Sequence, residues 1–155
     1  QFGYVKVNGN ITFFKTFFKA FANLQNCTFG GNLMLSNAKF AGYADFSNSI
    51  ISEITNLSYG EFTGTARFTY VRFDGRADFI KTRFEKEATF KFNDFNNITR
   101  FSEVEFMGKT SFEDNVFSVR MPEIKKLKSA ENIELTFINN FRPDHTEIPT
   151  FEFNK

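Results

Sequence analysis

Large apolar residues recur along this chain in steps of five and six residues that alternate without a break. From Phe2 to Phe117 the alternation passes through 22 positions; each is a large apolar residue, and 17 are Phe. The full set is Phe2, Val7, Phe13, Phe18, Leu24, Phe29, Leu35, Phe40, Phe46, Ile51, Leu57, Phe62, Phe68, Phe73, Phe79, Phe84, Phe90, Phe95, Phe101, Phe106, Phe112 and Phe117. An 11-residue repeat therefore covers residues 2–117, and the fold must place these side chains in its interior.

Neither a long helix nor a single long strand satisfies this repeat. At roughly 100° per residue, steps of five and six residues turn by about 140° and 240°, so the apolar side chains would point to opposite sides of a helix. The many Phe, Asn, Thr and Gly residues are also poor helix formers. In one continuous strand, a step of five residues moves a side chain to the opposite face. The repeat therefore predicts short strands separated by regular turns.

A small residue precedes many of the large positions by two residues. Because residues two apart in a strand share a face, each small-x-large triplet predicts a three-residue strand with two inward side chains. The remaining residues of each step then turn a corner. The small positions are Thr16, Ala22, Cys27, Ala38, Ala44, Gly60, Ala66, Val71, Ala77, Ala88, Thr99 and Thr110.

Glycine marks most of the corners in the six-residue steps, two residues after the large residue that opens the step. Glycine adopts a positive φ without steric cost, so we expect a widened turn with positive φ at this place. Ala20, Glu53, Lys86 and Asn97 fill the same place in other repeats, so glycine is a preference rather than a requirement. The glycines concerned are Gly9, Gly31, Gly42, Gly64, Gly75 and Gly108.

The triplets ADF at 44–46 and 77–79, with the near-copies ARF at 66–68 and ATF at 88–90, resemble the repeated motif of the pentapeptide-repeat protein family. The resemblance covers about three quarters of the chain and is closest to the Phe-rich variety with alternating five- and six-residue steps. It implies an all-β, right-handed quadrilateral β-helix in which two successive repeats form one coil. A different number of faces stays open, but four places each glycine corner above another glycine corner. Large residues two repeats apart should then stack in four columns, with coils about 4.8 Å apart.

The repeat ends at Phe117, which divides the chain into a β-solenoid at 1–117 and a C-terminal cap at 118–155. Continuing the register would place Glu123 and Lys128 in the core. Residues 121–129 instead predict a short helix, with Pro122 in its first turn. Its apolar side would contain Met121, Ile124 and Leu127. Further along, the alternation of Ile133, Leu135 and Phe137 predicts a strand, residues 142–149 a loop, and residues 150–153 another short strand.

Phe14, Phe17 and Phe21 fall outside the inward register, at corner or outward positions close to the N-terminus. A buried corner role and an interface role are both compatible with these positions, and clustered exposed aromatic residues are typical of a contact surface. The repeat also starts at Phe2 with no polar segment ahead of it, and open strand edges are normally covered. We therefore expect this end to bind a protein partner or a second copy, as a homodimer or a longer assembly, or to continue into repeats of a longer parent chain.

No pattern in the sequence predicts an enzyme. Cys27 occupies a small inward position, so we interpret it as a core residue rather than a nucleophile. The single histidine, His145, lies in a predicted loop, and a zinc site needs about four ligands. Phosphate-binding glycine loops, the dinucleotide-binding fingerprint and the HExxH motif are all absent from the sequence. We predict no catalytic residue, no cofactor and no metal site.

Charge narrows the remaining function classes. The net charge is +1, and residues 67–117 contain nine Lys or Arg and nine Asp or Glu. Arg67, Arg72, Arg83 and Arg100 each precede an inward Phe, but at different corners, so we expect no basic stripe for nucleic acid. The family resemblance implies an alternative, because some pentapeptide-repeat proteins mimic DNA and bind type II topoisomerases. That mimicry needs a strongly negative face, which this balance of charge does not favour.

The sequence gives little information on location. No apolar run reaches the length of about 20 residues that spans a membrane. A signal peptide is not visible either, so we expect a soluble protein and leave the cellular compartment open. Together these observations predict a non-enzymatic structural or protein-interaction module.

Overall fold

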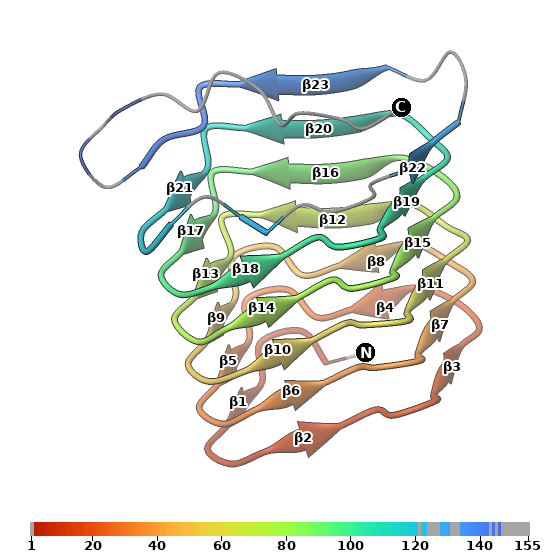
Figure 1. The fold of residues 1–155 in the computed structure, drawn as a ribbon. Coiled ribbons are helices and arrows are strands. Elements are labelled where there is room, and N and C mark those ends of the chain that lie inside the picture. The colour runs from red at the N-terminus through yellow and green to blue at the C-terminus, as the bar shows by residue number, and fades with distance from the viewer. Residues whose placement is uncertain are drawn as a thin grey trace.

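The computed structural model describes residues 2–120, 122–123, 128–130, 134–142, 144 and 146, and this part of the chain contains strands and turns but no helix. Short parallel strands stack in about 6 turns to form a β-solenoid with four sheets (Figure 1). The predicted all-β quadrilateral solenoid is therefore confirmed.

Each sheet forms one face of the solenoid, and we name the faces A to D in the order in which the chain meets them. Face A contains β1 (Lys6–Val7), β5 (Thr28–Phe29), β9 (Ile50–Ile51), β13 (Arg72–Phe73), β17 (Asp94–Phe95) and β21 (Val116–Phe117). Face B contains β2 (Ile11–Thr12), β6 (Leu33–Met34), β10 (Thr55–Asn56), β14 (Ala77–Asp78) and β18 (Thr99–Arg100). Face C contains β3 (Phe17–Phe18), β7 (Lys39–Phe40), β11 (Glu61–Phe62), β15 (Arg83–Phe84), β19 (Glu105–Phe106) and β22 (Lys128–Ser129). Face D contains β4 (Ala22–Asn23), β8 (Ala44–Asp45), β12 (Ala66–Thr69), β16 (Ala88–Lys91), β20 (Thr110–Glu113) and β23 (Leu135–Ile138).

Strands on one face pair in parallel with the strands two repeats away, in an unchanged register as far as Phe117. The predicted columns are therefore present. The ring of Phe90, for example, stacks on Phe68 at 4.8 Å and on Phe112 at 4.5 Å between centroids. Rings from neighbouring columns meet edge to face, as Phe79 and Phe90 do at an interplanar angle of 82°. Stacking along the axis and edge contacts across it together fill the core.

The residues with positive φ lie at the corners of the five-residue steps. They recur once in every repeat, and the glycines described by the structure have no positive φ at all. Our prediction of positive φ at the glycine corners was therefore wrong. The residues with positive φ up to the end of the repeat are Tyr4, Lys15, Asn26, Asn37, Asn48, Tyr59, Tyr70, Lys81, Phe92, Glu103 and Asp114.

Glycine serves a different purpose at the corners of the six-residue steps, where successive coils approach closely. A Cβ atom on Gly64 would lie 2.2 Å from the carbonyl oxygen of Gly42, and one on Gly75 would lie 2.2 Å from that of Glu53. Gly9, in the first coil, has no neighbour within 4 Å of such an atom. Glycine is thus needed where one corner rests on another, because a side chain would collide with the backbone of the preceding coil.

The solenoid continues beyond Phe117, contrary to the sequence prediction. Lys128 of β22 pairs with Glu105, and Phe137 of β23 pairs with Phe112, so both pairs are further apart in the sequence than the paired residues of the earlier coils. The additional residues move Glu123 and Lys128 to outward positions, and the backbone of Glu123 forms a parallel β-bridge with that of Arg100. The core therefore never has to accept either charge.

The helix predicted at 121–129 is wrong at the residues that the structure describes. Glu123 forms a β-bridge, and Lys128 and Ser129 form a strand, whereas Met121 and residues 124–127 lie outside the described residues. The strand predicted around Leu135 and Phe137 is confirmed as β23. Ile133, most of the predicted loop at 142–149, and the predicted strand at 150–153 lie outside the described residues.

Candidate interaction surfaces

Phe14, Phe17 and Phe21 lie on the outside of the first coil, with exposed fractions of 52%, 58% and 41%. Phe17 is the outward residue of β3 on face C, Phe14 lies at the corner before β3, and Phe21 lies at the corner before β4. The Nζ atom of Lys15 lies 5.1 Å from the centre of the Phe14 ring, and Phe21 stacks on Tyr43 at 5.3 Å. The fold thus brings the three side chains to one coil but not to one face.

The same places in the second coil are less apolar. One coil later, Ser36 takes the place of Phe14 and Lys39 takes the place of Phe17, and both replacements are polar. Only Phe21 is followed by another aromatic residue, Tyr43. The apolar outer surface is therefore a property of the first coil and not of the repeat, which means that the folding of the solenoid does not require it.

Inside the first coil, Phe2, Phe13 and Phe18 pack against the core but stay partly exposed. Phe40, which stacks directly on Phe18 at 4.6 Å, is fully buried. The first coil therefore presents apolar side chains around its circumference. Exposed aromatic surface of this kind is normally covered by another protein surface.

Face C carries a column of alternating charge beyond Phe17. Lys39, Glu61, Arg83, Glu105 and Lys128 follow it at successive coils. Ion pairs join Lys39 to Glu61 at 2.8 Å, Arg83 to Glu105 at 3.0 Å, and Lys128 to Glu105 at 2.9 Å. The hydrogen bond from Lys128, together with the charge of Arg83, lowers the pKa of Glu105. Sequence reasoning missed this column, although reading the outward residues two repeats apart would have found it.

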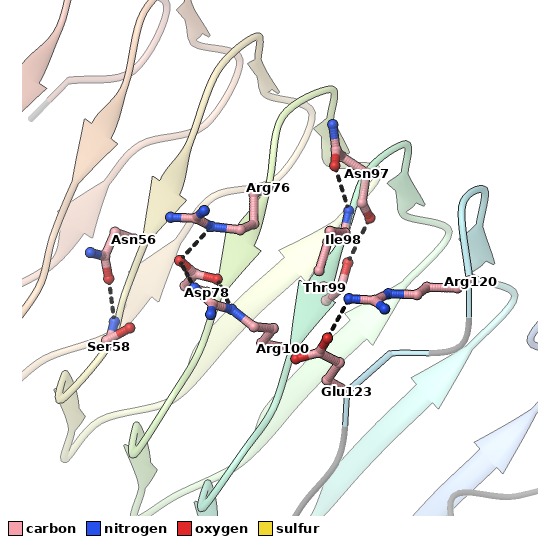
Figure 2. Close-up of polar contacts among 10 residues, drawn as sticks. All are labelled: Asn56, Ser58, Arg76, Asp78, Asn97, Ile98, Thr99, Arg100, Arg120 and Glu123. Carbon is pink, nitrogen blue, oxygen red and sulfur yellow. Dashed lines mark hydrogen bonds and ion pairs between the residues drawn. The ribbon is translucent and has the colours of Figure 1, made fainter.

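Face B holds a buried carboxylate between two guanidinium groups (Figure 2). Asp78 is only 3% exposed and accepts hydrogen bonds from Nε and Nη2 of Arg100, at 2.7 and 2.8 Å, and from Nε of Arg76 at 2.9 Å. One coil further on, Arg120 pairs with Glu123. The carboxylate of Asp78 is thus bound on both oxygens by fixed cations. We interpret it as a strong link between coils rather than as a proton acceptor for a substrate.

The four arginines singled out in the sequence lie on four different faces. Arg67 is on face D, Arg72 on face A, Arg83 on face C and Arg100 on face B. Arg72, Arg83 and Arg100 each form an ion pair with a carboxylate, and Arg67 lies over the ring of Tyr43. These residues therefore do not form a basic stripe.

Of the two residues considered for chemistry, the structure describes Cys27 but not His145. Cys27 is buried, and its thiol donates to the carbonyl oxygen of Phe2 at 2.8 Å, which confirms its place in the core. His145 is outside the described residues. Among the residues that are described, no three or more His, Cys, Asp or Glu side chains are placed to hold a metal ion. The described part of the chain also has no helix of the length and apolar character that crossing a membrane requires.

A scan against protein-family models, a search of curated proteins and a search of solved structures find no match for this chain. The similarity to pentapeptide-repeat proteins therefore rests on the residues of the repeat alone.

Proposed function

We propose that this chain is a non-enzymatic protein-interaction module of the pentapeptide-repeat kind. In this proposal the solenoid is a rigid scaffold that binds a protein partner or a second copy of itself through the first coil. The observation that carries the proposal is the exposure of Phe14, Phe17 and Phe21 around that coil. Aromatic side chains supply a large contact area with few rotatable bonds, and Phe, Tyr and Trp are enriched at protein interfaces relative to the rest of the surface.

The distribution of charge does not favour the alternative, a DNA mimic that binds a type II topoisomerase. On face C, cations and anions alternate along the axis, and on face B Asp78 is enclosed by two arginines. Charges paired in this way produce neither an extended negative face nor an extended basic one. Protein contact through an apolar surface is therefore the better-supported proposal.

Sedimentation across a concentration series tests the self-associating form of the proposal. The wild-type chain should sediment as a larger species at high concentration, and Phe14→Lys/Phe17→Lys should shift the equilibrium to the monomer. A matched control is Tyr70→Lys/Phe92→Lys, which changes two exposed aromatic residues that stack at a corner in later coils, with exposed fractions of 57% and 43%. The control should associate like the wild type. A wild-type chain that stays monomeric throughout would contradict self-association.

A further inference from the structure

We propose that two copies of this chain dock side by side through face C, in antiparallel orientation about a two-fold axis. This inference rests on the proposed function, since it assigns a second copy as the partner, and it extends the surface from Phe17 of the first coil along face C. Charge complementarity along one column of side chains is the basis for choosing this partner.

The column consists of the outward residues of the strands on face C. When the columns of two copies face each other in opposite directions, Glu61 of one copy lies opposite Arg83 of the other at the centre. The next pair brings Lys39 to Glu105, and at each end Phe17 meets Lys128. Every position then faces an opposite charge or, at the ends, an aromatic ring faces a cation, which attracts it. The column in order is Phe17, Lys39, Glu61, Arg83, Glu105 and Lys128.

The two central charges of the column, Glu61 and Arg83, do not form an ion pair with each other within one chain. Glu61 and Arg83 are opposite each other in the pairing of β11 with β15, yet neither is the other's ion-pair partner in the described structure. Glu61 binds Lys39, toward the N-terminal end, at 2.8 Å. Arg83 binds Glu105, toward the C-terminal end, at 3.0 Å. This separation divides the column into two charge clusters with a gap between them.

An open groove of about 430 Å³ lies along this part of face C. Its lining includes Tyr59, Glu61, Lys81 and Arg83, so it contains both of the separated charges. A two-fold axis through the groove lets Arg83 of each copy reach Glu61 of the other. The two charge clusters of each chain are then joined through its partner.

The outward columns of the other three faces lack this self-complementarity. On reversal, each of them brings a charged side chain opposite an apolar or uncharged one. The mismatched pairs are Thr12 with Arg100 and Met34 with Asp78 on face B, Asp45 with Ser111 and Arg67 with Thr89 on face D, and Lys6 with Val116 and Ile50 with Arg72 on face A. Face C is therefore the face that selects its own copy.

The charges and the aromatic residues have separate roles in this arrangement. Exposed ion pairs contribute little affinity individually, but a complementary row of them fixes register and orientation and disfavours other alignments. Apolar contact comes from Phe17, which is 58% exposed and is covered at each end of the interface by Lys128 of the other copy. The same residue belongs to the exposed aromatic surface of the first coil.

Charge reversal tests whether self-association uses the charged column of face C. Glu61→Lys/Glu105→Lys makes the charged column entirely positive, and Lys39→Glu/Arg83→Glu makes positions 39–105 entirely negative. Each variant alone should have a dissociation constant raised by at least about tenfold in sedimentation equilibrium, because like charges then oppose each other. An equal mixture of the two variants should form the dimer again, since every charged pair then joins a positive side chain of one variant to a negative side chain of the other.

Two control variants carry the same changes of charge beside or on face D: Glu87→Lys/Glu113→Lys and Arg67→Glu/Lys91→Glu. They should dimerise like the wild type, and circular dichroism establishes that all variants are folded. If the wild type associates but the folded face C variants stay monomeric when mixed, the antiparallel arrangement is overturned while self-association stands. A wild type that is monomeric at every concentration overturns both.

Discussion

The side-chain amide of Asn115 donates a hydrogen bond to Oδ1 of Asn140 at 2.8 Å, although these residues lie further apart in the sequence than equivalent residues of the preceding coils. The same amide donates to the carbonyl oxygen of Phe90 at 2.9 Å. One coil earlier, Asn93 bonds to Phe68 and Asn115 in the same way. All three asparagines are buried. This ladder holds the last coil in register after the strict hydrophobic repeat has ended.

Replacing Asn115 with Ala should therefore destabilise the protein more than an ordinary surface change. The substitution removes the side-chain partner of the carbonyl oxygen of Phe90 and of the backbone N–H of Asn93, and it takes one hydrogen bond each from the side chains of Asn93 and Asn140. Each buried group left unpaired costs about 1–3 kcal/mol. Urea denaturation measures the loss in the free energy of unfolding. The control is Asn96→Ala, which removes a half-exposed amide bonded to Asp74. Equal losses in both variants would show that the buried ladder has no special role.

Phe90→Ala should be among the most destabilising substitutions in the chain. The ring is fully buried between Phe68 and Phe112, so its removal leaves a cavity that the stacked neighbours on either side cannot fill. Losses of this kind are about 3–5 kcal/mol. Phe92→Ala, two residues away on the outside and 43% exposed, is the matched control and should cost well under half as much. Comparable melting temperatures for the two variants would contradict the assigned core.

Gly64→Ala and Gly9→Ala test whether glycine occupies these corners because successive coils stack closely or because glycine has greater conformational freedom. If close stacking is the reason, the first change should cost about 1–3 kcal/mol through steric overlap with the backbone of Gly42. The second should be neutral, because nothing lies within 4 Å of the added methyl group. If conformational freedom were the reason, both changes would destabilise the protein. Thermal unfolding of the two variants measures the difference.

The sequence was sufficient to predict the core because the same spacing of large apolar residues recurs in coil after coil. Residues such as Phe68, Phe90 and Phe112 occupy equivalent positions, and the same spacing can be read from many coils at once. The last coil lacks this redundancy. Its longer offsets break the repeat, and the spacing of Met121, Ile124 and Leu127 also fits a helix. Because this coil occurs only once, no equivalent stretch of sequence helps to decide between a helix and a further coil of the solenoid.

The corner geometry was misassigned because glycine has two distinct uses. It permits a positive φ, and it also permits close approach of two backbones. The sequence contained a clue to the true place of the positive φ in Asn26, Asn37 and Asn48, since asparagine tolerates this conformation better than most residues. The exposure of Phe17 was predictable from its place outside the inward register. The charge column beyond it became evident only when the four faces were known.

Acid should weaken the ion-pair cluster on face C in a defined range of pH. The hydrogen bond from Lys128 and the charge of Arg83 lower the pKa of Glu105 in the folded protein. A carboxyl group with a lowered folded-state pKa contributes stability that is fully present above its unfolded value of about 4.3. That contribution is lost as the pH falls through the folded value.

The comparison of wild type with Glu105→Gln tests this, since the variant lacks the contribution at every pH. The difference in unfolding free energy should be about 1 kcal/mol or less near neutral pH, because the side chains are partly exposed. It should stay constant down to about pH 5 and shrink below about 4.3 as the wild-type carboxylate gains a proton. Glu53→Gln, at an exposed corner and without an ion pair in the described structure, is the control and should show little difference at any pH. A difference for Glu105→Gln that grows on acidification would contradict the assigned direction of the pKa shift.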